Sequence, residues 1–195
     1  LESANCKVIG LDRDKSAIER GNEIAKNYDG RLSLIQTQFG EIANLELGDI
    51  DAVVLDIGVS SYQIDQAERG FSFSKDGPLD MRMDNSQGQT AAEWLVSVEE
   101  EHLANVIFQY GEERYSRRIA KAIKLAGEIT TTAQLAEIVK VAHPKWEKHK
   151  HPATRTFQAI RIAINKELDD IETFLPQAVE LLKVQGQLAV ISFHS

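Results

Sequence analysis

Asp12, Phe39 and Asp56 each stand at the end of a segment with the apolar pattern of a strand. In open parallel sheets, ligands bind beyond the carboxyl ends of the strands. A carboxylate at such a position accepts hydrogen bonds from both ribose hydroxyls of an adenosine cofactor. A phenylalanine there can lie against the flat base. Each residue keeps a structural alternative, Asp12 as a solvated loop acid and Phe39 as a core residue.

The stretch from Asp56 to Asp84 is polar and rich in turn-forming residues, which is typical of binding sites rather than of cores. Because Asp56 ends a buried strand, its carboxylate should have a partner, such as the amino group of a ligand or substrate. Capping of the next turn is the alternative. Aromatics beside arginines indicate stacking on single-stranded nucleic acid, or only the pinning of a long loop. The candidate substrate contacts are Ser60, Ser61, Arg69, Phe71, Phe73 and Arg82.

The formal net charge of −8 is unevenly distributed along the chain. Residues 110–161 hold eleven Lys and Arg against five Glu, a balance of +6, and the rest of the chain carries −14. Such asymmetry is typical of a nucleic-acid face on an acidic body, with a solvated helical surface as the alternative. Arg117, Arg118, Lys121 and Lys124 predict a basic helix that binds phosphates without reading sequence.

Other chemistries find little support in the residue patterns. The sequence has neither a zinc-ligand spacing nor a phosphate-binding glycine motif, and we predict no metal site. His143, His149 and His151 lie near lysines, in a pattern more typical of a basic surface. One cysteine, Cys6, and the lack of an apolar run of the roughly 18–20 residues that span a bilayer predict a cytoplasmic protein.

Strand and helix patterns alternate at both ends of the chain, which predicts an α/β fold with a parallel sheet. The run 51–58 is almost continuously apolar, which indicates a strand covered on both faces. The predicted strands are 7–14, 32–39, 51–58 and 187–193, and the predicted helices between them are 15–28 and 165–186, the latter ending at Gly186.

A helical pattern replaces this alternation in the middle of the chain. Predicted helices cover 90–111, 113–127 and 130–143, and a turn followed by a helix begins at His151. The predicted domains are therefore a sheet-containing core of residues 1–84 and 165–195 and an all-helical insertion of residues 85–164.

The segment LDIGVSSYQIDQAERGFSFSKDGPLDMRMD, residues 55–84, closely resembles the MraW-type family of bacterial 16S ribosomal RNA cytosine-N4 methyltransferases. TAAEWL, YGEERYSRRIAKAI, HPATRTFQAIRIAIN and GQLAVISFHS resemble further blocks of that family, in its order. The resemblance covers essentially the whole chain.

This resemblance implies a Rossmann-like class I methyltransferase core with an inserted RNA-substrate domain. It implies transfer of a methyl group from S-adenosylmethionine to N4 of a decoding-centre cytosine in 16S ribosomal RNA, within the small ribosomal subunit. Carried over by position, the cofactor contacts are Asp12, Phe39, Asp56 and Gln63. Asp56 is also the candidate catalytic residue.

The chain departs from the family pattern at two places. Tyr62 stands where the family usually has proline after two serines. The family's glycine-rich cofactor loop and the strand before it should precede Leu1, so we expect this chain to be a fragment with an incomplete sheet. A non-catalytic RNA-binding or ribosome-assembly module is the alternative function if that loop is truly absent. A nicotinamide-dependent dehydrogenase would need an upstream glycine fingerprint as well.

Overall fold

The structure is a computed structural model, and it describes residues 1–2, 5–144 and 151–192. Two compact units make up the chain, and each is described by itself. Unit 1 comprises Leu1–Gly58 and Leu168–Ser195, and unit 2 comprises Val59–Glu167. Among the described residues, no helix is both long and apolar enough to cross a membrane.

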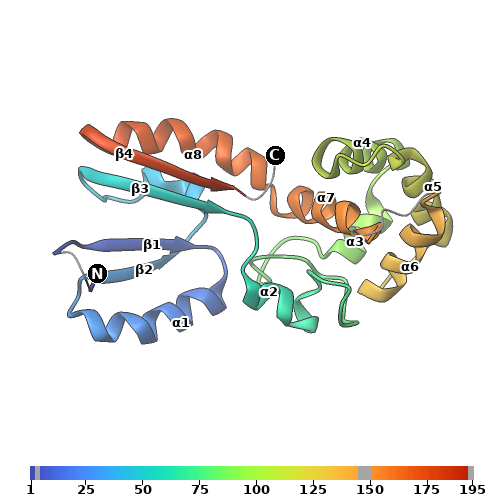
Figure 1. Cartoon of the computed structure of the whole chain (residues 1–195), viewed down its shortest axis with the longest axis horizontal. Coiled ribbons are helices and arrows are strands. Elements are labelled where there is room, and N and C mark those ends of the chain that lie inside the picture. The colour runs from blue at the N-terminus through green and yellow to red at the C-terminus, as the bar shows by residue number, and fades with distance from the viewer. Residues whose placement is uncertain (3–4, 145–150, 193–195) are drawn as a thin grey trace. The chain divides into compact units, whose positions relative to one another are not determined.

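Unit 1 has parallel strands joined by helices (Figure 1). β1 pairs with β2 in parallel, with α1 between them in sequence, and β3 pairs with β4 in parallel, with α8 directly before β4. This is the arrangement of a Rossmann-like α/β fold. The elements of unit 1 are β1 (Val8–Asp12), α1 (Lys15–Ala25), β2 (Leu32–Gln36), β3 (Ile50–Ile57), α8 (Glu167–Leu181) and β4 (Leu182–Ser192), with 3-10 turns at Lys26–Tyr28 and Phe39–Asn44.

Local sequence explains how α1 forms and packs. Asp14 caps its N-terminus, because the Asp14 carboxylate accepts from the Ser16 backbone N–H at 2.9 Å. Gly10 of β1 and Gly21 of α1 both lie against Leu34 of β2, where an added Cβ would be 2.8 Å and 3.0 Å from its side chain. Small residues at these two positions therefore allow α1 to approach the β1–β2 pair closely.

α8 joins the two strand pairs of unit 1. Phe174 and Ala178 of α8 pack with Leu55 of β3 in a small apolar core, and Leu11 of β1 packs against that core. Arg13, just after β1, forms an ion pair with Asp170 of α8. The end of β1 is therefore fixed to the same helix that covers β3.

The strands of unit 1 are more exposed than their apolar sequences predict. Val54 of β3 is 68% exposed, so the prediction that this strand is covered on both faces is wrong for the described residues. In the part of the chain that the structure describes, each strand pair is a separate two-stranded sheet, and no strand pairs with both β1 and β3. The helix after residue 165 ends at Leu181 rather than at Gly186, because Leu182 already pairs with Ile50. Phe193 lies outside the described residues.

Unit 2 is helical and encloses the larger core. Leu103 and Ile107 of α4 pack with Ile119, Leu135 and Ile160 from three further helices, and all five are fully buried. Its helices are α2 (Ser61–Asp65), α3 (Ala91–Ser97), α4 (Glu100–Gly111), α5 (Ser116–Ala126), α6 (Thr132–Ala142) and α7 (Ala153–Asn165), with a 3-10 turn at Ala67–Arg69.

Two sequence predictions for this unit need correction. The predicted helix 90–111 is two helices, because Val98 and Glu99 adopt extended backbone between α3 and α4. Residues 59–84 fold with the helices, since Phe71, Leu79 and Met81 are part of the helical core. Compact packing therefore divides the chain after Gly58, not after residue 84.

Candidate functional site

Asp12 ends β1 beside the end of β2. It is the register partner of Gln36, and its carboxylate accepts from the Asp14 backbone N–H at 2.8 Å. The side chain keeps contact with solvent, but burial by surrounding atoms raises the pKa of the Asp12 carboxyl, against the lowering effect of the Asp14 hydrogen bond. A carboxylate that is partly desolvated and still accessible is suited to accept from paired hydroxyl groups.

Phe39 begins the 3-10 turn after β2 and is half-buried. Its ring meets Phe174 edge to face, with centroids 5.3 Å apart, and it packs against the small core of unit 1. The structure therefore places Phe39 as a partial core residue at the carboxyl end of its strand. The predicted contact with an adenine base stays a prediction.

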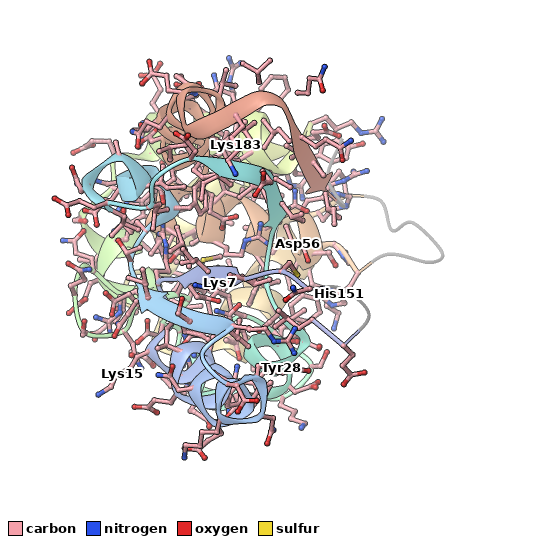
Figure 2. All side chains as sticks on the ribbon, turned by 90° about the vertical axis from the view of Figure 1, so that its left-hand side faces the viewer. Lys7, Lys15, Tyr28, Asp56, His151 and Lys183 are labelled. Atoms are coloured by element: carbon pink, nitrogen blue, oxygen red, sulfur yellow. The ribbon has the colours of Figure 1, made fainter. Side chains whose placement is uncertain are left out.

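Asp56 lies near the carboxyl end of β3 as the register partner of Ile191, and its side chain is exposed. The expected partner for a desolvated carboxylate is not needed here, because the residue keeps its solvent. In Figure 1 the arrowheads of β1, β3 and β4 point the same way, so Asp12 and Asp56 share one end of unit 1. Asp51 lies near the other end of β3, where it pairs with Lys183 at 2.8 Å. Lys183 and Asp56 are both labelled in Figure 2.

Ser60 and Gln63 form the cap of α2. Gln63 donates its backbone N–H to Ser60 Oγ at 3.2 Å, and its side-chain Oε1 accepts from the Ser60 N–H at 3.0 Å. Gln63 is buried, whereas Ser60 and Ser61 are exposed. The structure thus gives the Gln63 carbonyl oxygen a capping role, and a cofactor contact by this residue stays a prediction.

Arg69 and Phe71 are both buried in unit 2. Arg69 Nη2 donates to the carbonyls of Arg82 and Met83 at 3.1 Å and 2.9 Å, and its guanidinium lies over the Phe71 ring. These contacts agree with the alternative interpretation, in which Arg69 and Phe71 hold a long loop in place.

Arg82 is also engaged within its own loop. It forms a two-point ion pair with Asp80, with both contacts at 2.8 Å, and its Nη1 donates to the carbonyls of Gln87 and Gly88. Asp80 accordingly raises the pKa of the Arg82 guanidinium. The residue closes the loop 80–88, and any contact with RNA would have to coexist with this role.

Phe73 is half-buried in an aromatic group that the sequence did not reveal. Its ring lies 4.6 Å from that of His151 and 4.9 Å from that of Phe157. His151 Nδ1 accepts from the Ala153 N–H, and burial lowers the pKa of His151, with Lys140 acting in the same direction. His151 is therefore a largely neutral aromatic partner rather than part of a basic surface.

His143 also differs from the predicted basic surface. Its side chain is nearly buried at the end of α6, and its Nε2 lies 3.3 Å from Glu113 Oε2. Glu113 is itself buried and accepts from the Tyr115 N–H at 2.8 Å. The signal available in the sequence was an acid at the start of a predicted helix, which does not indicate burial. His149 lies outside the described residues.

The basic helix is α5. Arg117, Arg118 and Lys121 are exposed on it, as the prediction of a phosphate-binding face requires. Lys124 is different, because its Nζ donates to the carbonyls of Leu95 and Val96 at 2.9 Å and 3.0 Å and so caps the end of α3. Lys124 is therefore a structural residue of the helical unit.

Unit 1 has parallel strands joined by helices, with acids at the carboxyl ends of the strands, and unit 2 is a helical insertion in its sequence. These features define a Rossmann-like α/β protein of the methyltransferase type. The sequence model of the MraW methylase family matches residues 1–195, and the chain belongs to that family. The prediction of family and fold class is thereby confirmed.

Curated relatives agree with this assignment. The chain is 67% identical over 195 residues to a protein of Acinetobacter baumannii named ribosomal RNA small subunit methyltransferase H, covering 98% of this chain and 63% of that protein. Proteins of the same name from Acinetobacter baylyi and Psychrobacter cryohalolentis are 65% and 51% identical, with 98% and 96% of this chain and 64% and 56% of theirs covered. The chain thus spans less than two thirds of the length of these relatives.

Proposed function

We propose that this chain belongs to an enzyme that transfers a methyl group from S-adenosylmethionine to N4 of a decoding-centre cytosine in 16S ribosomal RNA, in the cytoplasm. The observation that carries the proposal is the placement of Asp12 and Asp56 at one end of the parallel strands in a chain matched throughout by the MraW methylase family. The relatives named as methyltransferases of small-subunit ribosomal RNA support the substrate class.

The residues present suit an adenosine cofactor. Asp12 offers a partly desolvated carboxylate for the ribose hydroxyls, and half-buried Phe39 offers an apolar surface for the base. When bound, S-adenosylmethionine supplies a methyl group already activated on a sulfonium. The chain's own task is then to place the acceptor nitrogen in line with that methyl group.

Asp56 is the residue best suited to assist the nucleophile. The exocyclic amine of cytosine is a poor nucleophile because its lone pair is delocalised into the ring. A carboxylate that accepts from its N–H raises the electron density on nitrogen as the C–N bond forms. The base must be unstacked or single-stranded to present this amine. In unit 2, Ser60, Ser61 and Phe73 are proposed contacts for the RNA substrate, with the α5 cations on its phosphates.

The proposal is tested by calorimetric titration of S-adenosylmethionine into the 195-residue chain and into a version extended to the length of the Acinetobacter baumannii relative. Binding by both, followed by methyl transfer to ribosomal RNA, is the expected result for a pocket made by Asp12, Phe39 and Asp56. Binding by the extended form alone makes this chain an incomplete part of the enzyme. Binding by neither favours the RNA-binding or ribosome-assembly module.

Cofactor affinity should depend on the charge of Asp12. Because burial raises the pKa of this carboxyl, its protonation begins at a higher pH than for an ordinary aspartate. Affinity should therefore weaken as pH falls through the raised pKa and recover as pH rises above it. In the Asp12→Asn variant the affinity should be weaker at neutral pH and lack this dependence. Titrations across acidic to neutral pH check both points, and an unchanged profile in the variant would contradict the role of Asp12.

The cations of α5 should contribute RNA affinity through counterion release. Replacing Arg117, Arg118 and Lys121 with alanine should weaken binding to 16S ribosomal RNA and reduce the salt slope of log K by about 2, at roughly 0.7 per phosphate contact. Replacing Lys7, Lys15 and Lys26 in unit 1 removes the same charge and is the matched control. Equal losses in the two triple variants, measured by anisotropy at several salt concentrations, would show an effect of net charge alone.

A further inference from the structure

The backbone of residues 79–83, here called the Met81 loop, is fully hydrogen-bonded although it belongs to no helix or strand. Leu79 donates to the Thr130 carbonyl at 2.9 Å, and the Leu79 and Asp80 carbonyls accept from the first N–H groups of α3. Asp80 donates to the Pro78 carbonyl, and Met81 donates to the Arg69 carbonyl. The loop is therefore fastened both to α3 and to the turn between α5 and α6.

Two side chains complete this set of hydrogen bonds. Asn165, the last residue of α7, donates from Nδ2 to the Met81 carbonyl at 2.8 Å and accepts from the Met83 N–H at 2.8 Å. Arg69 donates to the carbonyls of Arg82 and Met83, and the Arg82 N–H donates to its neighbour Asp80. Asn165 is 6% exposed and also donates to the Arg161 carbonyl at 2.9 Å. Both ends of its amide are thus in use.

The conformation held in this way is strained. Met81 is fully buried and has a φ of 63°, in the left-handed backbone region that residues other than glycine rarely adopt. Such a conformation persists only where the surroundings over-determine it, and strain of this kind is concentrated at functional sites. A buried strained residue in a loop with complete backbone pairing indicates a segment that is built to keep one shape.

We propose that Asn165 is a positioning residue for RNA, which fixes the Met81 loop in the one conformation that the RNA substrate meets. The inference rests on the proposed function, because RNA is taken from there as the ligand. Leu79 donates to the carbonyl of Thr130, in the turn that follows the basic helix α5, and the paired Arg82 and Asp80 side chains of the loop keep partial contact with solvent. A surface that is already ordered does not lose conformational entropy when RNA binds.

Asn165→Asp is the informative change, because it is nearly the same size and keeps the acceptor for Met83 but faces the Met81 carbonyl with an oxygen instead of a donor. Asn105→Asp, on the exposed face of α4, adds the same charge to the same unit and is the control. If the binding-competent fraction of the loop falls to about a tenth, the apparent Kd for RNA rises about tenfold. We expect this rise for Asn165→Asp only, with faster hydrogen exchange at the Met81 and Met83 amides.

Binding is measured with transcribed 16S ribosomal RNA at a temperature where both variants are folded, as judged by circular dichroism. In methyl-transfer assays of the extended protein, the KM for RNA should rise while kcat at saturating RNA stays within about twofold. A folded Asn165→Asp variant with unchanged RNA affinity overturns the proposal and leaves Asn165 a purely structural role.

Arg69→Lys provides a second variant, because lysine cannot reproduce the paired donation of Arg69 to the loop carbonyls, and it should weaken RNA binding in the same way. If neither variant folds, the Met81 loop is a requirement of the fold alone and the proposal is overturned. Methyl transfer by the unaltered extended protein is measured separately. Its absence would overturn the proposed reaction, whereas the role of Asn165 is decided by RNA affinity.

Discussion

The Asp56→Ala variant of the extended enzyme is expected to lose methyl transfer to ribosomal RNA by at least about a hundredfold, the lower range for a group that assists proton movement in the transition state. Asp56 is exposed near the carboxyl end of β3, so its removal leaves no buried cavity and should not unfold unit 1. The loss should appear in kcat, because the interaction with the amine strengthens only as the C–N bond forms.

Asp51→Ala is the matched control for this change. Asp51 is exposed on the same strand, and its carboxylate pairs with Lys183, away from the candidate site. Single-turnover assays with labelled cofactor should show near-normal transfer for Asp51→Ala and little for Asp56→Ala. Asp56→Asn separates two roles, since an amide oxygen still accepts a hydrogen bond but takes up no proton. Retained turnover in Asp56→Ala would remove Asp56 from the mechanism.

A second large effect is expected at Glu113, in stability rather than in chemistry. Its buried carboxylate accepts from the Tyr115 N–H at 2.8 Å, lies 3.3 Å from His143 Nε2, and lies 3.9 Å from Arg155 Nη1. It therefore joins the α4–α5 turn to the end of α6 and the start of α7. Glu113→Ala should lower the free energy of unfolding by about 3–5 kcal/mol, the range for breaking a buried pair and leaving its partners unsatisfied.

Urea unfolding followed by circular dichroism measures this loss. Glu128→Ala, in the exposed turn between α5 and α6, removes the same charge from unit 2 and should change stability by less than about 0.5 kcal/mol. Glu113→Gln keeps an acceptor for the Tyr115 N–H and should fall between the two. If Glu113→Ala lowers the free energy of unfolding no more than Glu128→Ala does, the buried contacts of Glu113 make no net contribution to stability.

Local patterns in the sequence predicted where the strands and most of the helices lie, although several of their ends differ by a few residues. The positions of Asp12 and Asp56 followed from short apolar runs, because a buried strand must be apolar wherever it lies in the fold. Asp14 and Thr131 cap α1 and α6 in the structure, and such caps are local features, since a capping side chain reaches only two or three residues ahead. Family and fold class came from the long blocks of resemblance, and the family match confirms them.

The tertiary structure decided what the polar side chains of residues 69–84 do. Arg69 and Phe71 have the residue types of a nucleic-acid contact, yet both are buried, and Arg69 holds backbone carbonyls. The partner that fixes the Met81 loop is Asn165, more than eighty residues away in sequence, and no local pattern links the two. Lys124 likewise looks like a phosphate-binding cation and instead caps α3. Charge and residue type are local properties of the sequence, whereas burial and hydrogen-bond partners depend on which distant segments the fold brings together.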